Sequence, residues 1–172
     1  MKTLRNISLT LILSMMVISF MSCLKKSKDD PFISLHSRDG RLANEWKLKS
    51  ADETMTFTFN GSTTTNTTSV INGIHSSSGS PYSLELTIEK DGKATCTVND
   101  DGDINSYTSY WSWLETGKKK STLLLGVVDW SCNSIWTVSR LANKELVLVH
   151  ETSYSDSNSS ETEKVTLTFE AK

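Results

Sequence analysis

The chain has 172 residues, a formal net charge of −2 and an apolar fraction of 37%. A chain of this length can bury an ordinary hydrophobic core, and no basic stripe interleaves with its aromatic residues, which argues against nucleic acid as a partner. Internal repeats and helical heptads are absent from the sequence, which argues against a solenoid or a coiled coil.

The N-terminus has a charged zone followed by an apolar zone. Lys2 and Arg5 precede an apolar run over residues 9–21. This run is well short of the ~20 residues that a helix rising 1.5 Å per residue needs to cross a bilayer. A charged start and a short apolar segment are typical of a secretory signal peptide. We therefore expect residues 1–22 to be a signal peptide.

Cys23 lies between the apolar run and a charged segment. With the small residue Ser22 before it, Cys23 resembles the cysteine of bacterial lipoproteins, which is diacylated on its thiol and begins the mature chain. Acyl chains contribute roughly 0.8 kcal/mol per buried CH₂, so two or three of them hold a domain on a membrane. The alternative is ordinary secretion, with cleavage near Ser19 and an unmodified Cys23.

Residues 23–34 are predicted to be the lipidated cysteine and a flexible tether, because the charged run KKSKDD at 25–30 is too short and polar to fold alone. The run resembles the lysine-and-acid signal that sends lipoproteins of the Bacteroidetes kind to the outer face of the outer membrane. The resemblance implies a protein lipid-anchored to the outer membrane, on its periplasmic or its surface-exposed face.

The remaining chain has the size of one domain. Without residues 1–22 it has 150 residues, 16 of them basic and 20 acidic, and a formal charge of −4. That length suits a single core, and we place the domain at residues 35–172.

Alternation of apolar and polar residues predicts strands. In residues 55–60, MTFTFN, apolar side chains alternate with threonines, and residues 83–89 and 93–99 repeat the pattern. Successive side chains of a strand point to opposite faces, so each segment has one apolar and one polar face. Between the last two, Asp91-Gly92 predicts a hairpin with a type I′ turn.

Further strands and their short connectors predict the fold class. These strands are predicted at residues 45–50, 106–115, 121–128, 134–141, 144–151 and 164–171. Connectors rich in Gly, Asn, Asp and Ser, such as residues 153–162, predict turns between antiparallel neighbours. An open sheet of many short strands would expose its edges. We therefore expect an all-β, antiparallel up-and-down meander of about eight to ten strands closed into a barrel, with at most a short N-terminal helix.

Residues 60–82 are too rich in Ser, Thr and Asn to be a core strand throughout. Long segments of this kind in compact domains are often functional. We expect either a long hairpin or a mobile flap over the open end of the barrel.

Two stretches suggest a family. Asp30-Pro31-Phe32 and Arg41 lead into LANEWKLKS at 42–50, and WTVSRLANKELVLVHE occupies residues 136–151. These stretches resemble the lipocalin-like lipoproteins of Bacteroidetes type. The resemblance implies a lipocalin-like barrel closed at its floor by Trp46.

The same resemblance has departures. Asn44 stands where lipocalins have the glycine of Gly-x-Trp. Arg41 and Arg140 are the candidates for the arginine that stacks on this tryptophan in lipocalins. A ligand cannot be transferred from the family, because a fold does not imply a function.

Aromatic residues are the candidate ligand-binding residues. Trp111 and Trp113 share one face of a predicted strand, Tyr110 lies on the other face, and Trp136 follows nearby. A barrel of about eight strands either fills with side chains or keeps room for one small ligand. Aromatic side chains line apolar pockets, so these four residues predict a site for a small apolar or sugar-like molecule. The alternative is that the tryptophans fill the core.

Residues suited to catalysis or to metal binding do not form a motif. His36, His75 and His150 are far apart in the sequence and share no ligand spacing, and no serine lies in a nucleophile motif. We expect no enzyme, no metal and no cofactor. Cys96 and Cys132 either form a disulfide outside the cytoplasm or remain thiols.

Two functions therefore remain ahead of an enzyme with an unrecognised site. The first is a lipid-anchored protein that binds a small apolar or sugar-like ligand in its barrel. The second is a non-catalytic interaction module for another envelope protein, with a barrel filled by side chains. The first predicts an aromatic cavity, and the second predicts a filled core and an exposed apolar patch.

Overall fold

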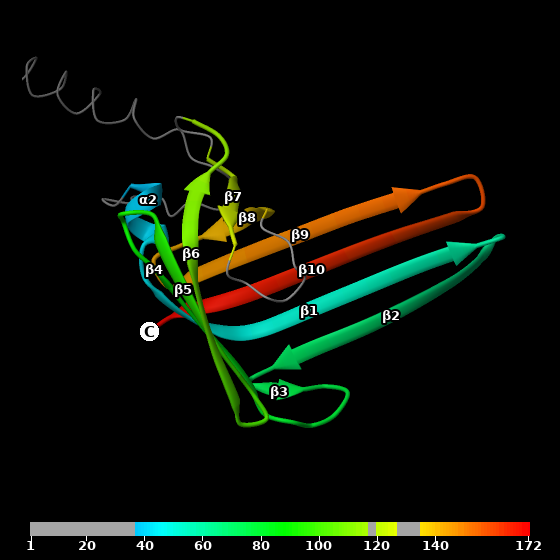
Figure 1. Ribbon diagram of the computed structural model, residues 1–172, viewed down its shortest axis with the longest axis horizontal. Coiled ribbons are helices and arrows are strands. Elements are labelled where there is room, and N and C mark those ends of the chain that lie inside the picture. The colour runs from blue at the N-terminus through cyan, green and yellow to red at the C-terminus, as the bar shows by residue number, and fades with distance from the viewer. Residues whose placement is uncertain (1–36, 117–119, 127–134) are drawn as a thin grey trace, which may run out of the picture. The chain divides into compact units, whose positions relative to one another are not determined.

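The computed structural model describes residues 37–116, 120–126 and 135–172. These residues form one short helix and ten strands of a single antiparallel sheet (Figure 1). The elements are α2 (Arg38–Leu42), β1 (Glu45–Phe59), β2 (Ser62–Ile71), β3 (Ile74–His75), β4 (Tyr82–Ile88), β5 (Lys93–Asp100), β6 (Asp103–Trp113), β7 (Thr122–Leu125), β8 (Ile135–Leu141), β9 (Glu145–Ser155) and β10 (Ser159–Ala171).

Eight of these strands close into a barrel. From β4 to β10 each strand pairs with the next along the chain, and β1 completes the ring by pairing with both β4 and β10. Closure leaves the ring without edge strands, which is how an antiparallel meander avoids exposed backbone groups. β2 and β3 lie outside the ring, between β1 and β4 in the sequence. The predicted fold class, an all-β antiparallel meander closed into a barrel with at most a short helix, is confirmed.

β1 is one long strand, where the sequence predicted two at 45–50 and 55–60. Its first residues pair with β4, whereas from Ser50 onward it pairs with β2. β10 pairs with both parts, and the register shifts at Lys49. A bulge of this kind bends a strand and increases its twist. Lys49 therefore marks the place where β1 exchanges β4 for β2 as its neighbour.

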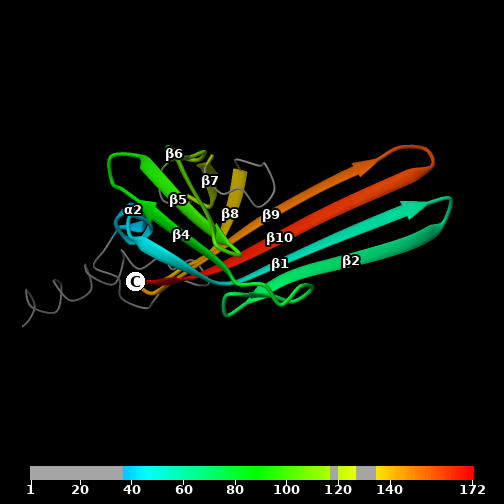
Figure 2. The same ribbon diagram turned by 60° about the horizontal axis from the view of Figure 1, so that its bottom comes forward.

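Beyond the barrel, the hairpins β1–β2 and β9–β10 run side by side (Figures 1 and 2). We call this part the four-stranded extension. It has the strand order β9–β10–β1–β2 and consists of residues 53–59, 62–68, 151–155 and 159–164.

Residues 153–162, predicted as a connector, are mostly strand. β9 and β10 remain paired as far as Ser155 and Ser160, so only a few residues near Asp156 turn the chain. Most side chains of the extension are at least partly exposed to solvent, so serine and threonine suit it, and β-branched threonine favours strands. The sequence prediction was wrong here because it equated polar composition with a loop.

Residues 60–82 contain a hairpin, which is one of the two structures expected for them. β2 pairs with β1 over ten residues and continues through a short turn into β3. Asn60-Gly61 and Asn72-Gly73 occupy the turns, and all four residues have positive φ angles, as type I′ turns require.

The predicted hairpin at Asp91-Gly92 is present, but its turn type was predicted wrongly. Of these two residues only Gly92 has a positive φ, of 96°. Glu89 accepts a hydrogen bond from the Gly92 N–H, so Lys90 and Asp91 are the central residues of the turn. Gly92 then occupies the left-handed position that follows a type I turn in longer hairpin loops.

The barrel core consists of inward-facing side chains from every strand of the ring. The largest fully buried ones are Trp46, Trp136 and Phe169. At one end α2 covers the ring, and Trp46 Nε1 donates a hydrogen bond of 2.9 Å to the Leu42 carbonyl of this helix. Ser37 caps α2 by accepting a hydrogen bond from the Gly40 N–H. Trp46 thus lies where the sequence placed a plug.

Candidate functional site

Side chains of the described residues occupy the barrel interior. Trp136, one of the four predicted ligand-binding residues, is fully buried, and its ring lies 5.7 Å from that of His150. Trp136 is opposite Leu123 of β7 in the sheet register, and Leu123 is also fully buried. Trp136 is therefore part of the core.

Trp111 and Trp113 are partly buried and pack against the same core. Their rings meet edge to face at 6.3 Å, and Trp111 Nε1 donates to the Glu89 carbonyl at 2.7 Å. Tyr110 lies on the opposite face of β6 and is 76% exposed. The four predicted residues thus do not line one cavity among the described residues: three contribute to the interior and Tyr110 faces away.

A polar cluster connects β6 to α2. The Asp39 carboxylate accepts hydrogen bonds from Trp113 Nε1 at 2.7 Å and from Lys120 Nζ at 2.8 Å, and the Arg38 guanidinium lies 5.4 Å from the Trp113 ring centre. The hydrogen bond from Lys120 lowers the pKa of Asp39, partial burial opposes this shift, and the Trp113 N–H adds to it. The Asp39 carboxylate thus binds both Trp113 and Lys120, which gives the Trp113 N–H a structural contact.

Arg41 and Arg140, the two candidates for a lipocalin-like stacking partner of Trp46, differ in environment. Arg41 belongs to α2 and is buried. Arg140 is exposed on β8 and forms an ion pair of 2.7 Å with Glu145. The environment of Arg140 is that of a surface ion pair.

Glu115 follows β6 and holds the start of β7. Its carboxylate accepts hydrogen bonds from the Thr122 hydroxyl at 2.6 Å, the Thr122 N–H at 2.8 Å, and the hydroxyl and N–H of Ser121. The side-chain and backbone hydrogen bonds from Thr122 lower the pKa of Glu115 from 4.5 to about 2, with smaller contributions from Ser121.

This carboxylate makes stability depend on pH. Because the folded pKa is depressed, the stabilisation by Glu115 is complete above pH 4.5 and is lost as the pH falls from 4.5 to about 2. Between pH 4.5 and about 2, we expect the urea midpoint of unfolding to fall less in Glu115→Gln than in the native protein. Glu151→Gln is the matched control, since Glu151 has only a 3.8 Å contact with Lys164. Equal acid sensitivity of Glu115→Gln and the native protein would contradict the prediction.

The cysteines are only partly covered by the described residues. Cys96 is fully buried on β5, where its side chain belongs to the barrel core. Cys23 and Cys132 lie outside the described residues. Lipidation of Cys23 and a Cys96–Cys132 disulfide therefore stay predictions.

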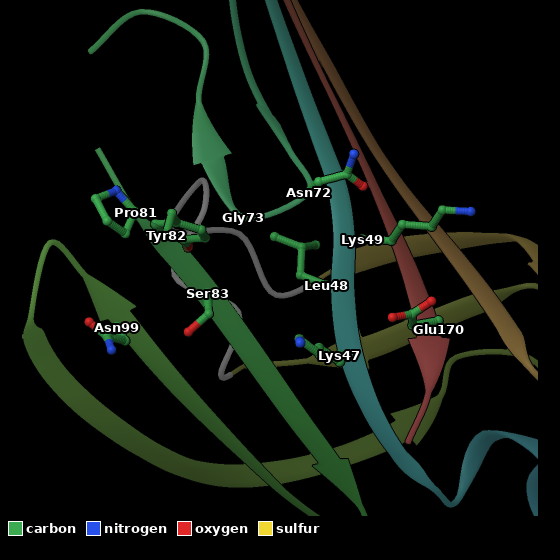
Figure 3. A pocket seen from close by; sticks show the side chains of 10 residues that line it. All are labelled: Lys47, Leu48, Lys49, Asn72, Gly73, Pro81, Tyr82, Ser83, Asn99 and Glu170. Carbon is green, nitrogen blue, oxygen red and sulfur yellow. The ribbon is translucent and has the colours of Figure 1, made fainter. Parts of the chain in front are cut away.

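A cleft of about 440 Å³ lies where β1 changes partners (Figure 3). The Asn72 N–H donates to the Lys49 carbonyl and the Tyr82 N–H donates to the Gly73 carbonyl, and these bonds hold the β2–β3 turn beside β1 and β4. The cleft is lined by Lys47, Leu48, Lys49, Asn72, Gly73, Pro81, Tyr82, Ser83, Asn99 and Glu170.

The lining of this cleft is mixed, with polar side chains beside Leu48, Pro81 and Tyr82. It combines lysine, amide and hydroxyl groups with one carboxylate, so it can both donate and accept hydrogen bonds. Its volume falls in the range of ordinary small-molecule sites, and among the described residues that line it Tyr82 supplies the only aromatic ring. None of the predicted tryptophans belongs to it.

The four-stranded extension exposes an apolar row that the sequence pattern placed on one face of a strand. Met55, Phe57 and Phe59, which we call the apolar row, are 40%, 47% and 51% exposed. The rings of the two phenylalanines stack at 6.4 Å. Paired residues of adjacent antiparallel strands share a face, and Met55 is paired with Glu163 and Phe57 with Glu161. The apolar row is thus bordered by carboxylates.

Within the described ranges, no three His, Cys, Asp or Glu side chains gather as metal ligands. No helix in that part of the chain has the length and apolar character to span a membrane.

The class of this protein is defined by its fold alone. No protein-family model, curated protein or solved structure matches the chain. The strand pairing defines a closed, eight-stranded antiparallel β-barrel protein, an architecture consistent with the lipocalin-like calycin fold. Membership of the lipocalin-like lipoprotein family stays a prediction.

Proposed function

We propose that this protein is a lipid-anchored, non-catalytic interaction module of the cell envelope. One observation favours an interaction module over a carrier of an internal ligand. In the part of the chain that the structure describes, large buried side chains occupy the barrel interior, whereas Met55, Phe57 and Phe59 are exposed on the four-stranded extension. A carrier of an internal ligand needs the opposite distribution, with an open interior.

The chemistry of the extension favours a partner with apolar and basic groups. Contiguous apolar side chains on a surface commonly mark an interaction site. Glu53, Glu161 and Glu163 share the face of the apolar row according to the strand register, and the paired residues of β2 and β9 on this face add no lysine or arginine. Complementary charge favours the correct partner and increases the association rate. We therefore propose another envelope protein, with a basic rim around an apolar contact, as the partner.

The anchor in this proposal depends on the sequence around Cys23. A signal peptide, a cysteine at its end and a charged tether would place the barrel at the outer membrane, within reach of envelope proteins. No enzyme activity is needed for such a role.

The two faces of β1 provide the test. A photoreactive phenylalanine analogue at Phe57 would probe the apolar face in intact cells, and the same analogue at Thr56 would probe the opposite face. We expect an adduct with a second envelope protein from position 57 and much less from position 56. Because an interface aromatic contributes about 1–2 kcal/mol, Phe57→Ala should reduce the adduct formed by a probe at position 59 by about tenfold.

Thr56→Ala is the control for the loss of side-chain volume, because it changes the same strand on the other face. Equal adduct yields from positions 56 and 57, or a yield insensitive to Phe57→Ala, would argue against the extension as the binding surface.

A further inference from the structure

The outer edge of β2 is unpaired along most of its length. β3 pairs only with Val70 and Ile71, and Ser76 binds Ser69. Among the described residues, no strand pairs with residues 62–68 on the side away from β1. An unpaired strand of this length presents backbone donors and acceptors to which another strand can bind.

The strand register identifies the backbone groups that point outward. In an antiparallel pair, alternate residues bond to the neighbouring strand. The Lys49 carbonyl accepts a hydrogen bond from the Asn72 N–H. Counting back along the register from this pair, the even-numbered residues of β2 are the ones that form backbone hydrogen bonds with β1. Ser69 accepts from the Ser76 N–H on the opposite side, which agrees with this alternation. The N–H and C=O groups of Thr63, Thr65 and Thr67 therefore point away from the sheet.

This edge lacks the features by which proteins prevent strand addition. Such edges usually carry lysine, proline, a bulge or an inward charge. From Ser62 to Ile71 the sequence is STTTNTTSVI, without a charged residue, proline or glycine, and its pairing with β1 is regular. Nothing in this strand repels an identical strand, and threonine pairs across strands favourably.

We propose that β2 pairs antiparallel with β2 of a second copy of this chain, with Thr65 opposite Thr65 on a two-fold axis. Thr63 of each copy then lies opposite Thr67 of the other. Each of the three outward-facing residues exchanges two hydrogen bonds with its partner, which gives about six across the interface. The contact is isologous, as in most homodimers.

Pairing at this edge would unite two extensions in one sheet. Residues opposite each other in an antiparallel pair lie on the same face, so the apolar rows of both copies would share a face of the joined sheet. The interface itself uses the backbone of β2 and none of the apolar row. This inference is therefore independent of the function proposed above.

Residue-resolved hydrogen exchange of the full chain, purified in detergent micelles, tests the pairing directly. In a monomer, the amides of Thr64 and Asn66 are protected by β1, whereas those of Thr63, Thr65 and Thr67 exchange freely. When the protein is concentrated, we expect all five of these amides to be protected from exchange. On dilution, only the amides of Thr64 and Asn66 should remain protected. Alternation that persists at every concentration would overturn the proposal.

Two proline variants test the interface without breaking the barrel. Thr65→Pro removes an outward N–H and leaves the bonds between β1 and β2 intact. Ser153→Pro is the matched control, since its N–H points outward at the opposite edge of the extension, on β9. By sedimentation velocity we expect Thr65→Pro to raise the dimer dissociation constant at least about tenfold, because each copy loses a donor.

The control should dimerise like the native protein. A native protein that is monomeric at all concentrations, or a dimer that Thr65→Pro weakens no more than Ser153→Pro does, would overturn the proposal. If Thr65→Pro fails to fold by circular dichroism, Thr65→Lys replaces it, with Ser153→Lys as its control. Two lysines facing each other on the axis should likewise dissociate the dimer.

Discussion

Replacing Trp46 by alanine should lower the free energy of unfolding by about 3–5 kcal/mol, the usual cost of removing a large buried aromatic side chain. Trp46 is fully buried at the end of the barrel that α2 covers, and its indole N–H binds the Leu42 carbonyl. The substitution would leave a cavity and an unsatisfied carbonyl at the same place. Urea unfolding followed by far-ultraviolet circular dichroism measures the effect.

Tyr110→Ala is the control for this experiment. Tyr110 is an aromatic residue of β6 but is 76% exposed, so its removal should change stability by no more than about 0.5 kcal/mol. Similar losses for Trp46→Ala and Tyr110→Ala would mean that Trp46 does not close the barrel in solution.

Replacing Cys23 by alanine should transfer the protein from the membrane fraction to the soluble fraction. If the thiol carries a diacylglyceryl group, two chains at roughly 0.8 kcal/mol per buried CH₂ account for nearly all of the membrane affinity. Alanine cannot be acylated, so the variant should also lose incorporation of a labelled fatty acid. Fractionation of cells grown with that fatty acid measures both effects.

Ser22→Ala is the matched control, since it keeps a small residue before the cysteine and keeps the thiol. This variant should remain labelled and membrane-bound. A Cys23→Ala protein that still sediments entirely with the membrane would exclude the lipid anchor, and the proposed function would then lack its location at the envelope.

Local patterns in the sequence predicted much of the barrel. In 83–89 and 93–99 the alternating residues are strands with buried faces, and the hairpin between them is where Asp91-Gly92 predicted it. The turn at Asp91-Gly92 differs in type because the loop is longer than two residues. A dipeptide cannot reveal the length of the loop that contains it, since the strand ends depend on pairing with the neighbouring strands.

The surroundings of the predicted aromatic residues could not be derived from the sequence. Trp111 and Trp113 share one face of β6, as their spacing indicated, and together with Trp136 they pack against other side chains of the core. Whether an aromatic residue lines a cavity or fills a core depends on the total volume of the side chains around it. These side chains come from different strands, and their packing has no signature in any one segment.

The edge of β2 was missed for a related reason. Its serines and threonines suggested a hairpin or a flap, and the two Asn-Gly pairs at Asn60 and Asn72 were the available signal for tight turns at both ends. Even when both turns are recognised, no local sequence pattern identifies which strand lies at the edge of a sheet. That depends on β4 pairing with β1 only before the bulge at Lys49.

The sequence by itself determined which residues alternate, where the chain turns and, through short connectors, that neighbouring strands are antiparallel. These are properties of a few consecutive residues. Only the tertiary structure decided that Met55, Phe57 and Phe59 are exposed while Leu84, Leu86 and Ile88, with the same alternation, are buried. Alternation shows which side chains share a face of a strand. What covers that face depends on closure of the ring. Leu84, Leu86 and Ile88 lie within the closed ring, whereas Met55, Phe57 and Phe59 lie beyond it.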